Sequence, residues 1–324
     1  MKEDTFGYLT KKLNVSKSTV SKALRHCSGV DSDTRQRILE EARKVNCLPK
    51  DVYSVYCILP DVPQYFWKGL RQGLIAGENQ DIAPTKYNIY TKSSDESAVL
   101  EYLREAKQMR AQVLIIAAYI TPEIHRQLEE MVSDCMIILL SEHDELKNSF
   151  YIGADSYGDG YTMGKRYLTE YAERTLLCLT VRDNINAQNR SAGFLDAVKE
   201  KKPCLLDNII RIEIENELFR DPKKFSSRLA SLLSGCVDND SSYCIYSPIG
   251  MAQLPIAVKK AGLTGRAVCM CHDCSADSPN GIDIRCNQDV FTQGYTAARA
   301  AVTFITSGQY PPEKNIYIPS KIQK

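Results

Sequence analysis

The sequence predicts an all-α headpiece of three short helices, followed by an α/β body that contains two parallel sheets. Two observations support this fold class. Apolar residues recur every three or four positions through the first fifty residues, as they do in short amphipathic helices. From Val52 onward, apolar runs typical of buried strands alternate with amphipathic stretches. The chain has 324 residues, enough for two or three domains, and we divide it into residues 1–50 and 51–324.

The overall composition is that of an ordinary globular protein, with 44% hydrophobic and 25% charged residues. No apolar run approaches the ~20 residues that a membrane-spanning helix needs, and Glu3 and Asp4 are unlike a secretory signal. We therefore expect a cytoplasmic protein with no membrane partner. The twelve cysteines are scattered, often within apolar runs, which favours reduced and buried thiols over disulfides.

Charge is unevenly divided along the chain. Residues 1–50 contain eleven basic and six acidic residues, a net charge of +5, so the other 274 residues carry −4 of the overall +1. A basic segment on a mildly acidic body is typical of a module that contacts phosphates, although a merely solvated basic surface gives the same pattern.

Three helices are expected in the headpiece. The first can be capped by Thr5 and ends at Asn14, which tolerates the left-handed backbone of a tight turn. The second is capped by Ser16, and the third begins after Val30 and stops before Pro49. The expected apolar stripes are Phe6, Leu9 and Leu13; Val20, Ala23 and Leu24; and Ile38, Leu39, Ala42 and Val45. This arrangement predicts a helix-turn-helix whose second helix enters the major groove of DNA, and a three-helix cap that binds no DNA is the alternative.

The headpiece resembles that of the lactose-repressor (LacI) family of transcription regulators. The shared pattern is carried by Val15, Ser16, Thr19, Val20, Ser21, Leu24, Val30, Thr34, Arg35, Ile38, Leu48 and Pro49. The resemblance implies that Lys17, Ser18 and Lys22 read bases. It implies contacts to the DNA backbone from Thr5, Ser16, Thr19, Ser21, Arg25 and Thr34. It also implies a homodimer on a pseudo-palindromic double-stranded DNA operator.

The headpiece departs from the family pattern at three points. Arg25 stands where the family usually has an asparagine, and Thr10 stands where it usually has an alanine. The third departure is in the linker: Pro49 is followed almost at once by the apolar run 53–60, so no hinge helix fits between them. The chain therefore resembles a divergent member with a shortened hinge. Either the first strand begins later than the apolar run suggests, or the protein binds DNA without a hinge helix. The second alternative predicts weaker DNA bending, because a hinge helix would wedge an apolar side chain between base pairs.

Strands and helices alternate through the body. The expected strands are 53–60, 111–119, 135–141, 175–181, 241–247 and 266–273, with helices such as 66–80, 95–108, 160–174 and 189–201 between them. Such alternation predicts parallel sheets covered on both faces, and so many units favour two sheets with a ligand cleft between them.

The body resembles the two-lobed, periplasmic-binding-protein-like effector domain of the same family. The matching segments are 58–61, 151–155, 189–197 and 287–295. The resemblance implies one lobe over residues 52–173 and 288–310 and a second over residues 174–287 and 311–324.

Seven residues fall where family members place ligand contacts: Gln64, Phe66, Trp67, Glu142, Arg190, Asp273 and Gln288. Aromatic rings pack on the face of a sugar or base, and Arg, Asp and Gln satisfy its polar edge. The expected effector is thus a small polar metabolite, a sugar or sugar derivative. Each residue could instead be structural, Trp67 in particular as part of a lobe core. Departures at Ser247–Gly250 and around Glu142 weaken the expectation of a standard pentose or hexose.

The predicted function is a ligand-responsive, sequence-specific DNA-binding repressor. We expect no enzymatic activity, no cofactor and no metal. Cys269–Cys274 contains soft donor atoms, but alternation along a strand directs them to opposite faces. Gly158–Arg166 lacks the residues that a phosphate-binding loop needs. The alternatives are a solute-binding or sensor protein with the same body, or a regulator with weakened DNA binding.

Overall fold

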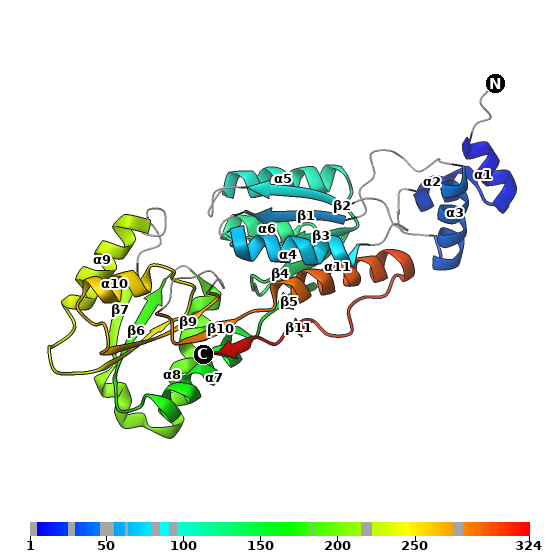
Figure 1. Cartoon of the computed structure of the whole chain (residues 1–324). Coiled ribbons are helices and arrows are strands. Elements are labelled where there is room, and N and C mark those ends of the chain that lie inside the picture. Colours follow the sequence, from blue (N-terminus) through cyan, green and yellow to red (C-terminus); the bar gives the residue numbers. More distant parts are fainter. Residues whose placement is uncertain are drawn as a thin grey trace. The chain divides into compact units, whose positions relative to one another are not determined.

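The computed structural model describes residues 5–24, 30–45, 55–61, 64–78, 85–90, 96–182, 184–214, 222–274 and 281–324. The chain divides into two compact units, which we call the first unit (residues 1–152 and 291–316) and the second unit (residues 153–290 and 317–324). The chain therefore crosses from one unit to the other three times. Each unit contains a six-stranded sheet with helices packed against it (Figure 1).

The sheet of the first unit has the strand order β11-β5-β4-β3-β1-β2. Its strands are β1 (Val55–Pro60), β2 (Thr85–Tyr90), β3 (Val113–Ile116), β4 (Met136–Leu140), β5 (Ser149–Gly153) and β11 (Asn315–Tyr317). Its helices are α4 (Gln64–Gly77), α5 (Glu96–Gln108), α6 (Pro122–Glu129) and α11 (Val290–Ser307). The strands from β2 through β5 pair in parallel.

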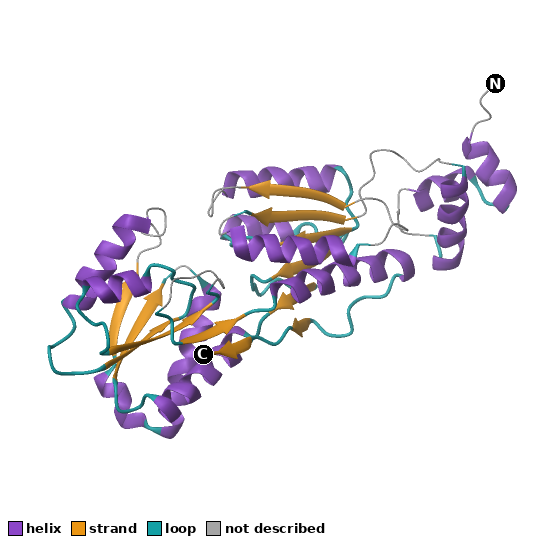
Figure 2. Cartoon of the chain, in the orientation of Figure 1, coloured by secondary structure: helices purple, strands orange, loops and turns teal. Residues whose placement is uncertain are grey.

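Both faces of this sheet are covered. On β1, Tyr56 and Ile58 belong to a core shared with α5 and α6, whereas Val55 and Cys57 lie beside side chains of α4 and α11. Because a strand directs alternate side chains to opposite faces, complete burial of β1 requires helices on both sides. Figure 2 shows these helices on either side of the strands.

The sheet of the second unit has the order β12-β10-β9-β8-β6-β7. Its strands are β6 (Thr175–Val181), β7 (Ile210–Ile214), β8 (Tyr243–Ser247), β9 (Ala267–His272), β10 (Ile284–Asn287) and β12 (Lys321–Gln323). Its helices are α7 (Ser156–Glu170), α8 (Ile185–Lys201), α9 (Pro222–Ser234) and α10 (Leu254–Lys260), with a short 3-10 helix η1 (Pro203–Asn208). Strands β7 through β10 are parallel and β12 is antiparallel to β10. The two-sheet α/β body predicted from the sequence is therefore confirmed.

Helices α7 and α8 touch through their backbones. A Cβ atom at Gly160 would lie 2.7 Å from the Cα atom of Arg190, and one at Gly193 would lie 2.9 Å from the backbone nitrogen of Tyr161. Real Cβ atoms do not approach so closely, so glycine is required at both positions. This contact fixes the position of Arg190 relative to α7.

Three short helices precede the first sheet: α1 (Thr5–Leu13), α2 (Lys17–Leu24) and α3 (Ser32–Lys44). Their buried apolar residues among those described all belong to the predicted stripes: Leu9, Val20, Ala23, Leu24, Ile38 and Ala42. The predicted Phe6, Leu13 and Val45 are only partly buried, and the side chain of Leu39 lies outside the described residues. The hydroxyl of Ser16 accepts a hydrogen bond from the Thr19 backbone N–H at 2.9 Å, which caps α2. The Asp31 carboxylate caps α3 in the same way, through the Thr34 N–H at 2.9 Å.

The predicted fold class, with a separate all-α helix-turn-helix headpiece, is wrong in its first part. Helices α1 to α3 have nine, eight and thirteen residues, and their segment falls within the first unit instead of forming a unit of its own. In residues 5–24 and 30–45, no separate headpiece is evident. The physical reason is size, because about forty residues bury too little apolar surface for independent stability. The shortened hinge at Pro49–Asp51 lies outside the described residues.

Among the described helices, none combines the length and the apolar character that a membrane crossing requires.

Candidate functional site

Three polar groups of the second unit meet at one edge of its sheet. Strands β8, β9 and β10 are parallel neighbours, so their carboxyl ends lie together, and Pro248, Asp273 and Gln288 follow these ends directly. Arg190 reaches the same edge from the first half of α8. In open parallel sheets this edge is where ligands bind.

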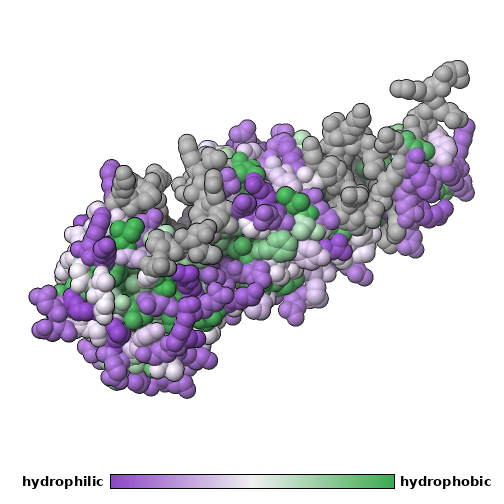
Figure 3. Space-filling model, in the orientation of Figure 1, coloured by the Kyte–Doolittle hydropathy of each residue, from purple (hydrophilic) through white to green (hydrophobic). Residues whose placement is uncertain are grey.

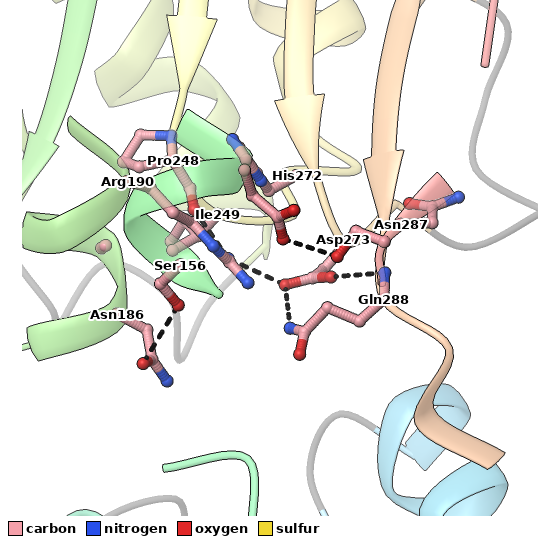
Figure 4. Close-up of polar contacts among 12 residues, drawn as sticks. Ser156, Asn186, Arg190, Pro248, Ile249, His272, Asp273, Asn287 and Gln288 are labelled. Atoms are coloured by element: carbon pink, nitrogen blue, oxygen red, sulfur yellow. Dashed lines mark hydrogen bonds and ion pairs between the residues drawn. The ribbon is translucent and has the colours of Figure 1, made fainter. Parts of the chain in front are cut away.

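Hydrogen bonds join these residues into one cluster (Figure 4). Nη1 of Arg190 donates to the carbonyl oxygen of Pro248 at 2.9 Å and lies 2.8 Å from Oδ2 of Asp273. Nε2 of Gln288 donates to the same Asp273 oxygen at 2.9 Å. The backbone N–H of Gln288 lies 3.4 Å from the other oxygen, Oδ1. Arg190, Asp273 and Gln288, which the sequence predicted separately, are thus in direct contact.

Arg190 and Asp273 form an ion pair in which the arginine is buried and the aspartate is partly exposed. The Arg190 side chain is 3% exposed and that of Asp273 is 14% exposed. Burial opposes the charge of Arg190, but Asp273, Tyr246 and Asp159 together outweigh it, so the pKa of Arg190 is raised. Within the part of the chain that the structure describes, Nε of Arg190 is buried without a hydrogen-bond partner. Such an unused donor in a polar cluster suits recognition of an acceptor atom.

The backbone at Asp273 is unusual. Its φ angle is +49°, in the left-handed region that few residues other than glycine adopt. The turn is held by the side chain of Asn287, whose Oδ1 accepts a hydrogen bond from the backbone N–H of Cys274 at 2.9 Å. Strained backbone of this kind concentrates at functional sites, which makes Asp273 a sound candidate.

Sequence reasoning missed some polar groups near this edge. The carbonyl of Pro248 is a backbone atom, so no residue pattern identifies it. Ser156 and Asn186 are buried in the first turns of α7 and α8, and the Ser156 hydroxyl donates to Oδ1 of Asn186 at 3.2 Å. Figure 4 shows this pair beside Arg190. No sequence pattern identifies this pair, because the burial of a polar side chain in the first turn of a helix is decided by the fold.

The other predicted ligand residues belong to the first unit. Phe66 and Trp67 lie in α4 with their rings in edge contact, 4.9 Å between centroids, and Trp67 is 9% exposed. Gln64 begins the same helix, but its side chain lies outside the described residues. Glu142 is half-buried and follows β4, two strand positions away from β1. A role in ligand binding stays a prediction for all four.

The predicted DNA contacts lie on the N-terminal helices. Lys17, Ser18 and Lys22 project from α2 and are exposed. Figure 3 shows that hydrophilic residues cover much of the visible surface of the described part of the chain. Ser16 is also exposed, whereas Thr19, Ser21 and Thr34 are half-buried. The side chain of Thr5, and Arg25 as a whole, lie outside the described residues.

Comparison with solved structures identifies the fold. GanP, a glucose-galactose binding protein from Geobacillus stearothermophilus, matches with a TM-score of 0.70 and 14% identity over 84% of this chain and 97% of GanP. A periplasmic solute-binding protein of an ABC transporter from Actinobacillus succinogenes, with bound D-allose, matches with a TM-score of 0.67 and 16% identity over 83% and 96%. A putative LacI transcriptional regulator from Bacteroides fragilis matches with a TM-score of 0.67 and 12% identity over 84% and 96%. No family model and no curated protein matches the chain.

The chain therefore has the two-lobed, periplasmic-binding-protein-like α/β fold. The matches with GanP and the Actinobacillus succinogenes protein span 84% and 83% of its length. These neighbours are described as binding proteins or a regulator and not as enzymes, in keeping with the expectation that the chain has no enzymatic activity. Membership of the LacI family is not confirmed, because no family model matches the chain and the likeness to a LacI regulator has only 12% sequence identity.

Proposed function

We propose that the chain binds a small, uncharged polyhydroxylated solute, a sugar or sugar derivative, and that the Arg190–Asp273–Gln288 cluster holds its hydroxyl groups. The observation that carries the proposal is a buried guanidinium paired with a carboxylate and an amide at the carboxyl edge of a parallel sheet. This is the solute-binding alternative expected from the sequence.

The chemistry of the cluster favours a neutral ligand. Arg190 and Asp273 together carry no net charge, so an anionic sugar acid would meet no uncompensated cation there. A guanidinium offers several donors in one plane, and a carboxylate and an amide oxygen are acceptors for the hydroxyl protons of a sugar. A polyol, which is both donor and acceptor at each oxygen, suits such a mixed set.

The neighbours support the same ligand class. GanP is described as a glucose-galactose binding protein, and the Actinobacillus succinogenes protein holds D-allose. Sequence identities of 14% and 16% are enough to infer a common fold, but they do not indicate which sugar this chain binds. A broad panel of neutral hexoses and pentoses is therefore the right probe.

Isothermal titration of that panel against the full chain tests the proposal. Arg190→Met should lower the affinity for the best sugar by about 10- to 100-fold, because hydrogen bonds to a charged group contribute about 1.5–3 kcal/mol. The matched control is Arg182→Met, since Arg182 belongs to the same unit but its side chain is 77% exposed. Gln288→Leu, which leaves the ion pair intact, should also weaken binding. Unchanged affinity in both Arg190 and Gln288 variants, or no binding by any sugar, would contradict the proposal.

A second candidate function is ligand-responsive DNA binding by the N-terminal helices of a homodimer, at a pseudo-palindromic site. It is favoured by the exposed Lys17, Ser18 and Lys22 of α2, by the net charge of +5 over residues 1–50, and by the likeness to a putative LacI regulator. The predicted cytoplasmic location belongs with this candidate.

Fluorescence anisotropy with the DNA upstream of the gene, over a series of salt concentrations, tests this second function. Binding to one sequence should fall steeply with salt, because neutralised phosphates release counterions. Lys22→Ala should cost roughly 1–3 kcal/mol on the preferred sequence, whereas Lys11→Ala, an exposed lysine of α1, should change little. Binding that ignores both sequence and salt would rule out this function, as would an equal loss in the two variants.

A further inference from the structure

A second group of chemically distinctive side chains lies on the α7 face of the second sheet. Cys286 on β10 and His272 on β9 are partners in the parallel ladder, so their side chains project from the same face. Asp159 belongs to α7, which packs against that face through Met163 and Tyr167. The donor atoms of Asp159, His272 and Cys286 all lie within 4.8 Å of one another.

The hydrogen bonds of His272 leave one ring nitrogen available as a ligand. His272 is 0% exposed, and its Nε2 lies 3.0 Å from the hydroxyl oxygen of Tyr246. The single proton of that hydroxyl is donated to the carbonyl oxygen of Arg190 at 3.2 Å. Nε2 must then carry the ring proton and donate it to Tyr246, which leaves a lone pair on Nδ1. In the described part of the chain, Nδ1 is buried and has no hydrogen-bond partner.

The other two groups are also held in place. Cys286 is 1% exposed. Asp159 accepts a hydrogen bond from the hydroxyl of Ser320 at 2.5 Å through Oδ2. Histidine and carboxylate ligands of metals are typically oriented by such outer hydrogen bonds, here one that His272 donates to Tyr246 and one that Asp159 accepts from Ser320.

The charges around the group favour a cation. Asp159 and Asp273 both act electrostatically on Arg190, so the region carries a net charge of −1 when both carboxyl groups are ionised. A divalent cation together with a Cys286 thiolate would bring the sum to zero.

We propose that Asp159, His272 and Cys286 form a three-residue binding site for a borderline-soft divalent cation of the Zn²⁺ class, a site beyond the proposed sugar-binding function. Thiolate, imidazole and carboxylate are the ligands that Zn²⁺ takes, whereas Mg²⁺ and Ca²⁺ require oxygen donors. Zn–ligand distances of about 2.0–2.3 Å place ligand atoms roughly 3.5 Å apart, so binding requires an inward shift of about 1 Å.

The spacing along the chain explains why the sequence did not reveal this site. Its ligands come from α7, β9 and β10, and only His272 lies in the Cys269–Cys274 segment that first suggested a metal. His272 also directly precedes Asp273, so an occupied site would stiffen the turn that carries the proposed sugar contact.

Metal titration of the full, chelator-treated chain tests the proposal with Zn²⁺ and Co²⁺ alone. One equivalent of Co²⁺ should bind and give the ultraviolet absorption of a thiolate–cobalt bond. Cys286→Ser should abolish that absorption and weaken Zn²⁺ binding by about 100-fold or more, because Zn²⁺ prefers thiolate to hydroxyl donors. The control is Cys178→Ser, since Cys178 is 0% exposed in the same core cluster but is not one of the three ligands. It should retain both signals.

His272→Gln provides a second variant if the Cys286 substitution impairs folding, which circular dichroism reports. The His272→Gln variant should weaken or abolish the thiolate–cobalt band and lower the Zn²⁺ affinity. An unchanged cobalt spectrum in Cys286→Ser would place the metal on other cysteines and overturn the proposal, as would the absence of stoichiometric binding. Sugar titrations are separate, so loss of the sugar-binding function would leave the metal result standing.

Discussion

Replacing Gly160 with alanine tests whether the contact between α7 and α8 sets the position of Arg190. A Cβ atom at residue 160 would lie 2.7 Å from the Cα atom of Arg190 and closer still to its carbonyl oxygen, whereas ordinary contact begins at 3.4 Å. The two helices must therefore separate by more than about 0.7 Å, the shortfall at the Cα atom, because the carbonyl oxygen is closer still. The clashing atoms belong to the backbone, so no change of rotamer relieves them.

The expected cost combines two opposing effects. Overpacking of this kind costs about 3 kcal/mol at the upper end of its range, and alanine regains about 1 kcal/mol of helix propensity over glycine. The net loss of unfolding free energy is about 2 kcal/mol. A shift of 0.7 Å along the contact would also stretch the 2.8 and 2.9 Å hydrogen bonds of Arg190 to the limit of about 3.5 Å. Sugar affinity should therefore fall together with stability.

Urea unfolding followed by far-ultraviolet circular dichroism measures the stability of the variant. A midpoint about 1 M lower than that of the wild type is expected, given a slope of about 2 kcal/mol per M. The control is Gly235→Ala at the exposed end of α9, where the nearest atom to a new Cβ is 3.5 Å away. If Gly160→Ala unfolds at the same urea concentration as this control, the backbone contact does not position Arg190 and the reasoning fails.

Two further predictions concern charge. Asp273→Asn should cost about 2–3 kcal/mol in urea unfolding because it removes the carboxylate that pairs directly with the buried Arg190 guanidinium, and adding Arg190→Met should recover part of this loss. Additive losses would exclude the ion pair. His125 of the first unit lies 2.8 Å from Asp144 and 3.5 Å from Glu129, and chiefly the hydrogen bond to Asp144 raises the pKa of His125. The pair therefore stabilises the fold fully below the unfolded pKa of about 6.5, and this contribution is lost as pH rises through the folded pKa. His125→Gln should lower the melting temperature at about pH 6 but hardly at about pH 9, and equal losses would refute the assignment.

The sequence located central strands better than edge strands. The run 175–181 coincides with β6, and 135–141 contains β4, because both strands are covered on two faces and read as unbroken apolar runs. The predicted strands include none of the four strands that end the two sheets, β2, β7, β11 and β12, and they also omit the interior strands β5 and β10. On β7 exposed and buried residues alternate, so the apolar signal is halved.

The sequence predicted which residues belong to the candidate site, but it did not predict which of them are in contact. Arg190, Asp273 and Gln288 were each expected from a resemblance, and their mutual hydrogen bonds depend on the order in which β8, β9 and β10 pair. Strand order is set by non-local packing, which no spacing along the chain records. The same limit hid His272 and Cys286, which are neighbours only through the β9–β10 register. The prediction of a separate headpiece was wrong for another reason. Apolar stripes indicate helices, but they do not determine whether those helices form a domain of their own.

The interleaved path of the chain through its two units has a consequence for folding. Residues 153–290 are inserted in the first unit as a loop of 138 residues, and closing so long a flexible loop costs about 4 kcal/mol of chain entropy. A folded second unit holds the two ends of that loop at a fixed separation and so removes most of this cost. The second unit in turn completes its sheet with β12, which follows the last segment of the first. Although their cores are separate, the stability of each unit therefore depends on the folded fraction of the other.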